Sequence, residues 1–445
     1  MERPHPRHSE PLGPLDEAIL YLDSPSEPWS VHLEVQLGGV LDETRLRWAV
    51  RTALHRHPRA AARLVATSRP GRRPEWHATP APSLDAFDVL PCEGDDDLAA
   101  AREELLSRPF SLEASPPLLV RLLRHRGGDV VMLNLHHAAG DGMAALVFLQ
   151  SVARAYDGRP DAVTDPAPSP VVTPGVCRRL AAVVAEVLRA ARPSARIASD
   201  GGRGVPGYAL HFLRLDAPRT RALRETARDG LTVNDLLVAA LHLTVARWNA
   251  EHASPCRRLS VLMPVNLRPR RQWREGFGNL TFMVPVVTLP RHRVSPSATV
   301  DAVRRRTRRI KEHGAAAAVA GCLRHVQSLP AVARRGIVRL AARERVMPTT
   351  LLSNLGALEH DLDFGPGVGP PTHVWFSPPA KMPLGLAIGA LTANDQLHVV
   401  LRVRHPLLGP EARGRLAASY ESALDALVDA RNRPAQPLPA RRRAA

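Results

Sequence analysis

A chain of 445 residues is too long for one ordinary hydrophobic core, so its length predicts two domains or two lobes. Its hydrophobic content of 44% and charged content of 23% are typical of a soluble globular protein. The longest apolar stretch, residues 236–246, is too short to span a bilayer, which argues against a membrane-spanning protein. The net charge of +17 suits an anionic partner such as nucleic acid, a phosphorylated cofactor or an acidic carrier protein, although a solvated arginine-rich surface is the commoner explanation.

The four cysteines, Cys92, Cys177, Cys256 and Cys322, lie far apart and show no metal-binding spacing. We therefore expect four free thiols in a reducing compartment. The first residues contain no apolar segment of the kind found in secretory signals. These features predict a cytoplasmic protein, for which peripheral membrane contact remains open.

In chain order, the first lobe is predicted to contain a short helix, a half-buried strand, a second helix, a hairpin and a third helix. The hairpin turns at Gly127 and Gly128. These elements occupy residues 14–23, 29–37, 41–58, 118–135 and 143–156.

Pro-rich and Gly-rich segments separate this lobe from the rest of the chain. Residues 157–175 are rich in Pro and Asp, residues 177–192 could form a helix, and residues 199–207 (SDGGRGVPG) contain four glycines. We therefore expect four parts, namely a first lobe, a crossover linker, a second lobe and a disordered basic tail. Their expected bounds are 1–157, 158–207, 208–431 and 432–445.

The second lobe is predicted to alternate strands with covering helices, which favours an α/β or α+β fold over an all-α fold. A capping box of Thr232 and Asp235 opens a helix that is apolar enough to be buried. A turn at Asn394 and Asp395 joins two of the strands. The expected strands lie within 208–216, 257–265, 280–290, 372–377 and 383–404, and the helices within 231–248, 298–345 and 410–430.

The segment NLHHAAGDGMAA (134–145) stands where a predicted strand becomes a helix. Gly140, Gly142 and Ala145 fit the dinucleotide pattern G-x-G-x-x-A, but four residues separate the pattern from the strand and its acid would repel phosphate. His137 and Asp141 have the i, i+4 spacing of helical metal ligands, but the glycines argue against a helix there and no third ligand is evident. Both alternatives are disfavoured, and we expect no metal.

A general base explains this segment better. His137 at the end of a strand lies at the edge of the sheet, where a substrate can reach it, and a neutral imidazole can accept a proton near neutral pH. Gly140 and Gly142 would permit a tight turn that directs Asp141 inward, where it could bind an arginine.

HHAAGDG (136–142) resembles the HHxxxDG signature of the chloramphenicol-acetyltransferase-like superfamily. That superfamily includes the condensation domains of nonribosomal peptide synthetases, polyketide-associated acyltransferases and bacterial wax ester synthase/diacylglycerol acyltransferases. The likeness is greatest to wax-ester-synthase-like and stand-alone condensation-like proteins. Further stretches that resemble these proteins are 14–23, 231–241, 263–270, 277–290, 351–358 and 362–367.

This resemblance implies two similar lobes in a V with a tunnel between them, entered by an acyl thioester from one side and by the acceptor from the other. His137 matches the catalytic histidine that deprotonates the acceptor, and His136 matches its structural neighbour. Asp141 matches an aspartate that pairs with an arginine, for which Arg268 is the candidate, and Gly142 allows the turn. The resemblance implies no covalent acyl-enzyme.

Four other residues are weaker candidates. Ser353 and Asn354 end a predicted strand and could face the tunnel, helping to stabilise an oxyanion, although ordinary turn residues would look the same. Asp363 and Gly365 belong to DFGPG, which resembles a structural motif far from the chemistry. Pro366 replaces the usual Trp of that motif.

We therefore expect an acyltransferase that forms an ester between an acyl group and a hydroxyl acceptor. The resemblance implies coenzyme A or a carrier protein's phosphopantetheine as the thioester co-substrate, with no bound cofactor. An amide-forming stand-alone condensation enzyme and a catalytically silent scaffold remain alternatives. No helix-turn-helix or basic motif with interleaved aromatic residues supports a nucleic-acid-binding protein.

Overall fold

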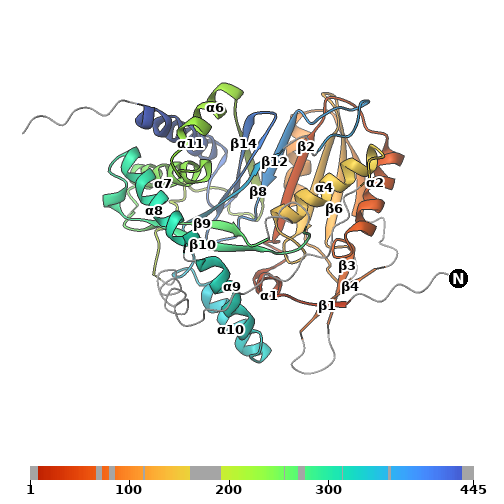
Figure 1. Cartoon of the computed structure of the whole chain (residues 1–445), viewed down its shortest axis with the longest axis horizontal. Coiled ribbons are helices and arrows are strands. Elements are labelled where there is room, and N and C mark those ends of the chain that lie inside the picture. Colours follow the sequence, from red (N-terminus) through yellow and green to blue (C-terminus); the bar gives the residue numbers. More distant parts are fainter. Residues whose placement is uncertain are drawn as a thin grey trace, which may run out of the picture.

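The computed structural model describes residues 9–66, 73–79, 86–113, 116–160, 192–254, 256–268, 276–312, 314–358 and 362–432. Their strands form three sheets, of three, five and six strands, and the two larger sheets are each mixed parallel and antiparallel. Helices cover both larger sheets (Figure 1). The mixed α/β architecture predicted from the sequence is confirmed.

The five-stranded sheet has the strand order β12-β2-β7-β6-β5. Its strands are β12 (His373–Ser377), β2 (Ser30–Gln36), β7 (Val130–His136), β6 (Leu118–His125) and β5 (Phe87–Cys92). Helices α2 (Glu43–Arg56) and α4 (Gly142–Tyr156) lie side by side on one face of this sheet (Figure 1). Helix α3 (Asp95–Ser107) packs on the other face through Leu98 and Leu105.

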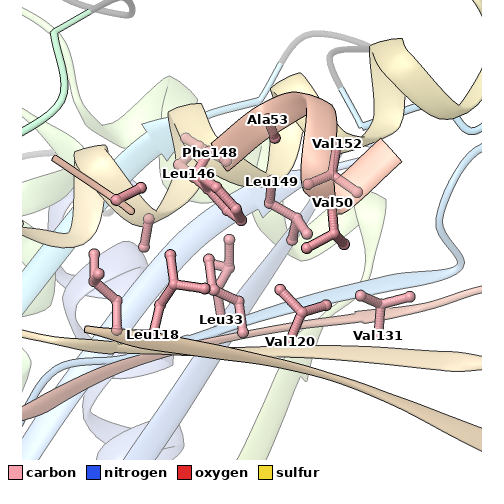
Figure 2. Packing of buried hydrophobic residues seen from close by; sticks show 14 of the residues in the cluster. Leu33, Val50, Ala53, Leu118, Val120, Val131, Leu146, Phe148, Leu149 and Val152 are labelled. Atoms are coloured by element: carbon pink, nitrogen blue, oxygen red, sulfur yellow. The ribbon is translucent and has the colours of Figure 1, made fainter. Parts of the chain in front are cut away.

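The core of this lobe follows from the alternation of residues along β2. Val31, Leu33 and Val35 point to the face that α2 and α4 cover, where all three are buried. Figure 2 shows Leu33 among strand residues that face Phe148 of α4 and Val50 of α2. This packing fixes α4, and with it the loop that precedes α4.

The six-stranded sheet has the strand order β10-β9-β11-β13-β14-β8. Its strands are β8 (Tyr208–Leu215), β9 (Leu259–Asn266), β10 (Thr281–Thr288), β11 (Thr350–Ala357), β13 (Leu386–Ala393) and β14 (Gln396–Arg404). The helices associated with it are α6 (Ala217–Thr226), α7 (Val233–Glu251), α8 (Pro296–Glu312), α9 (Ala315–Val326) and α11 (Pro410–Asn432), with a short 3-10 turn at Pro290–His292. Helix α10 (Ala331–Ala341) packs against the helix at Pro14–Leu22 instead. The remaining elements are α1 (Pro14–Leu22) and the small sheet of β1 (Ser9–Pro11), β3 (Ala62–Val65) and β4 (Glu75–Ala78).

One strand departs from the expected division of the chain. Residues 208–431 were expected to form the second lobe alone, yet β12 pairs antiparallel with β2 at the edge of the first sheet. Trp375, for example, lies opposite Glu34. The second half of the chain therefore completes the sheet of the first half, and the two lobes share a strand.

The local signals for turns and caps are confirmed. Gly128 adopts a φ of 111° between β6 and β7, and Asn394 and Asp395 adopt φ angles of 49° and 58° between β13 and β14. Thr232 and Asp235 form the predicted capping box of the buried helix α7. The predicted helix at 177–192 and the basic tail lie almost wholly outside the described residues.

Candidate active site

The loop after β7 is held from its first residues by the strands on either side. The backbone N–H of His136 donates to the carbonyl of Pro117 at 2.7 Å, and that of His137 donates to the carbonyl of Trp29 at 2.7 Å. Both histidines are buried, and the loop then enters α4 at Gly142. The backbone of both histidines is therefore anchored at the end of β7, the central strand of the first sheet.

The ring of His136 is fixed on both of its nitrogens. Its Nδ1 accepts a hydrogen bond of 3.1 Å from the backbone N–H of Ala138, and its Nε2 lies 3.3 Å from Oδ2 of Asp23. Asp23 also accepts the backbone N–H of Trp29 at 2.8 Å. Burial acts to raise the pKa of Asp23, but the contact with His136 and the backbone N–H of Trp29 outweigh it and hold that pKa below its ordinary value. His136 thus ties the loop to the segment before β2.

His137 is in a different environment. Its Nδ1 is buried and makes no hydrogen bond with another described residue, and its ring centroid lies 6.2 Å from that of Trp29. Burial lowers the pKa of His137, although its own backbone carbonyl and the charge of Asp141 act in the opposite direction. The imidazole is therefore neutral near pH 7, the form that can accept a proton.

Asp141 is saturated with hydrogen bonds. Its two carboxylate oxygens accept from both terminal nitrogens of Arg268 at 2.9 and 2.8 Å, from the Thr281 hydroxyl at 2.7 Å, and from the backbone N–H groups of Leu280 and Ala144 at 3.1 and 3.0 Å. Burial acts to raise the pKa of Asp141, but Arg268 and these other donors hold it below its ordinary value. With five donors bound, the carboxylate is an anchor and has no free position for proton transfer.

Arg268 is likewise satisfied. Besides the bidentate pair with Asp141, its Nε donates to the carbonyl of Gly276 and its Nη2 to that of Gly278, each at 3.0 Å. Its side chain is fully buried. The structure thus places the expected arginine directly against Asp141, and the bond joins the first lobe to the β9–β10 segment of the second.

Close packing explains why the residues on either side of Asp141 are glycines. Neither Gly140 nor Gly142 adopts a positive φ. Instead, a Cβ at Gly140 would lie 2.7 Å from the Cβ of Ala144, and one at Gly142 would lie 2.8 Å from the ring of Phe376 in β12. Close packing therefore requires glycine at both positions, and Asp141 turns inward between them, as expected, as the N-cap of α4.

A second network holds the middle of the loop. The side-chain amide of Asn279 donates to the carbonyls of His137 and Ala138 at 2.7 and 3.2 Å and to Oδ1 of Asp16 at 2.8 Å. Asp16 in turn pairs with Arg59. The backbone of His137 is therefore fixed by Asn279 before β10, which is itself held by Asp16 of α1 and, through it, by Arg59 in the segment after α2.

Ser353 and Asn354 lie within β11, which continues to Ala357, so the expectation that they end the strand is wrong. The register of β11 on β13 shifts after Asn354, whose Oδ1 accepts the N–H of Gly356 at 2.9 Å. Ser353 is buried. The next residue, Leu355, reaches the loop, with its Cδ2 3.1 Å from the position of a Cβ at Gly142.

Asp363 and Gly365 form a turn at the other end of α4. Oδ1 of Asp363 accepts the N–H of Gly365 at 2.9 Å, and Gly365 has a φ of 93°. A Cβ at Gly365 would collide with Asp157, the C-cap of α4. A helix of 15 residues separates this turn from Asp141, a distance of about 22 Å.

The described part of the chain shows no metal cluster and no membrane-spanning helix. Among those residues no group of three or more His, Cys, Asp or Glu side chains could hold a metal ion. None of the described helices is long and apolar enough to cross a membrane. Cys92 and Cys256 are free thiols, as expected, whereas Cys177 lies outside the described residues.

The chain has relatives along nearly its whole length. Rv2305 of Mycobacterium tuberculosis strain H37Rv and MT2362 of strain CDC 1551 are each 33% identical to it over 431 residues, which cover 93% of this chain and 98% of theirs. This chain belongs to the Rv2305 family. Both relatives are described as uncharacterized proteins, and no family model matches the chain.

Solved structures show that this chain has the fold of condensation domains. The trichothecene 15-O-acetyltransferase TRI3 of Fusarium sporotrichioides superposes with a TM-score of 0.72 at 12% identity, covering 94% of this chain and 95% of its own. The starter condensation domain of rhizomide synthetase, in complex with C8-CoA and Leu-SNAC, gives 0.68 at 16% identity with 95% of each chain covered. The epimerization domain of tyrocidine synthetase B gives 0.67 at 15% identity, covering 97% and 98%. Because the fold also occurs in an epimerization domain, it does not by itself fix the reaction.

Sequence reasoning missed several residues that position the loop in this Rv2305-family protein. Asp16 and Asn279 lie in stretches that resemble the superfamily, but no local pattern indicates that they meet at His137. Asp23 ends the first of these stretches without any pattern that links it to His136, and Arg59 lies outside all of them. Only the three-dimensional arrangement assigns these four residues to the site.

Proposed function

We propose that this Rv2305-family protein is an acyltransferase that moves an acyl group from a thioester to a hydroxyl, forming an ester. The observation that carries the proposal is the environment of His137, a buried imidazole with a lowered pKa on a loop fixed by both lobes. A general base needs a neutral ring on a well-placed backbone, and the lowered pKa and the backbone hydrogen bonds of His137 support this assignment.

In the proposed step, His137 removes the proton of the acceptor hydroxyl as its oxygen attacks the thioester carbonyl. The tetrahedral intermediate collapses with loss of the thiolate, and the imidazolium returns its proton to sulfur. An ester and a free thiol result, and no acyl group is bound to the protein. The donor is an acyl-CoA or an acylated carrier protein.

The other residues of the loop serve as positioning groups in this mechanism. Asp141 cannot act as a second base because its carboxylate accepts five hydrogen bonds and has a lowered pKa. His136 is held between Asp23 and the N–H of Ala138. We assign Ser353 and Asn354 to the wall of a substrate tunnel between the lobes, where a hydroxyl or amide would stabilise the oxyanion.

Two lines of support favour ester over amide formation. First, several stretches of this chain resemble wax ester synthases, which are enzymes that form esters. In addition, TRI3, which superposes over nearly the whole chain, is by its name an O-acetyltransferase. Amide formation, the chemistry of peptide condensation, is the second candidate because two other structural neighbours are condensation domains of peptide synthetases.

A substrate panel tests the proposal. The purified protein is incubated with acyl-CoAs and acyl-carrier proteins, each with and without alcohols and amines, while thiol release and product mass are followed. We expect thiol release that depends on an alcohol, together with the mass of an ester. Release that depends only on amines would establish the second candidate, and no acceptor-dependent release with any pair would favour a silent scaffold.

A further inference from the structure

A cavity of about 160 Å³ lies between the two lobes, away from the residues of the candidate active site. One face of α3 forms its first wall, and β8 with the turn between β14 and α11 forms the second. Its polar lining comes from Arg102, Glu103, Arg203, His405 and Arg413. The Gly-rich segment 199–207, which the proposed acyl transfer leaves without a role, contributes Arg203.

The positive charge of this cavity is only partly compensated, because its arginines outnumber its one carboxylate, Glu103. Arg203 and Arg413 form no ion pair or hydrogen bond through their side chains with any described residue, and Nε of Arg413 is buried without a partner. Burial lowers the pKa of Arg413, and the charge of Arg203 lowers it further while Glu103 opposes both. Arg102, by contrast, is bound to Glu34. Two guanidinium groups that repel each other across a cavity favour an anion between them.

Two neighbouring groups strengthen this preference. His405 is buried and lines the cavity, and its Nε2, 3.3 Å from Oε1 of Glu103, makes no hydrogen bond. The 23-residue helix α11 begins at Pro410 on the cavity wall and adds the partial positive charge of its N-terminus. Glu103 is the single carboxylate in the lining and is half-exposed.

We propose that this cavity binds a phosphate group. Sites for drug-sized ligands have volumes of ~300–1,000 Å³, so a cavity of about 160 Å³ suits one small anion and excludes an acyl chain. Arginine forks match the geometry of phosphate oxygens. The phosphate would belong either to a coenzyme A donor or to free inorganic phosphate. Only the first source rests on the proposed function; the site itself does not.

Binding to the full chain tests this proposal without any acceptor or turnover. Titration calorimetry with inorganic phosphate, with coenzyme A and with pantetheine (which lacks phosphate) compares the wild type with Arg203→Ala/Arg413→Ala. We expect phosphate to bind the wild type and the double variant to bind it about tenfold more weakly or worse. If coenzyme A supplies the phosphate, it binds more tightly than both other probes and loses the same factor.

The matched control is Arg247→Ala/Arg308→Ala, which removes two exposed helical arginines and the same net charge. It should bind phosphate as the wild type does. Arg203→Ala alone, on an exposed residue, keeps the test decisive if the double variant fails to fold. No phosphate binding, or an equal loss in the control, overturns the proposal. A protein that binds phosphate yet transfers no acyl group would refute the proposed function alone.

Discussion

The two ends of the loop between β7 and α4 are held by different lobes. At the His136 end, Asp23 and the neighbours of β7 in the first sheet hold the ring and backbone. At the Asp141 end, Arg268 and Thr281 of the second lobe hold the carboxylate. His137 lies between them, so its position depends on how the two lobes are placed. The difference teaches that the paired groups at the two ends of this loop serve geometry, whereas the imidazole of His137 is the group to which we assign the proposed chemistry.

Breaking the Asp141 end should have the largest effect on stability. Arg268→Ala leaves a buried carboxylate without its charge partner, and we expect the free energy of unfolding to fall by about 3–5 kcal/mol. Chemical denaturation followed by circular dichroism measures the change. Arg247→Ala, which breaks an exposed pair on α7, is the control and should cost less than about 1 kcal/mol. Equal stability of the two variants would show that the pair does not hold the lobes.

Breaking the contact between Asp23 and His136 should lower the free energy of unfolding by less, because Asp23 is partly exposed and only this one contact changes. Asp23→Asn keeps an oxygen for the N–H of Trp29 but loses the carboxylate that faces His136. We expect a loss of about 0.5–1.5 kcal/mol in the free energy of unfolding. A loss as large as that of Arg268→Ala, in the same denaturation assay, would contradict the unequal roles of the two ends.

The smallest expected effect is a shift of the pH profile of the reaction rate, which tests the assignment of His137 as the base. A base is active when unprotonated, so the rate falls as pH drops through its pKa. Burial lowers the pKa of His137 from 6.5, and the acid limb of kcat/KM should therefore lie below pH 6.5. Rates of thiol release in buffers of constant ionic strength give the profile. An acid limb above pH 7 would require a different base.

Local signals predicted much of the fold because their causes are local. The glycines of the β6–β7 hairpin, the left-handed pair Asn394–Asp395 and the Thr232 capping box each act within four residues. The pairing of β12 with β2 joins Trp375 to Glu34 across more than three hundred residues, and no periodicity encodes such a partner. The same limit explains why β12 was expected in the second lobe.

The residues of the candidate site likewise divide into those that a local motif predicts and those that only tertiary contacts reveal. The motif alone singled out His136, His137 and Asp141, and the likeness of the later stretches led to Arg268. Asn279 and Asp16 were missed because their roles depend on tertiary contacts. The packing reason for Gly142 was also missed, since the neighbour that crowds it is Phe376 on β12, far away in the sequence.

The central claim is that His137 is the general base, and its removal tests that claim most directly. Acceptor-dependent thiol release by His137→Ala, with the donor and acceptor that the panel identifies, should fall about 100-fold or more. The variant should stay folded by circular dichroism, and His55→Ala, at an exposed histidine on α2, should keep the wild-type rate. A folded His137→Ala variant with full activity would contradict the mechanism.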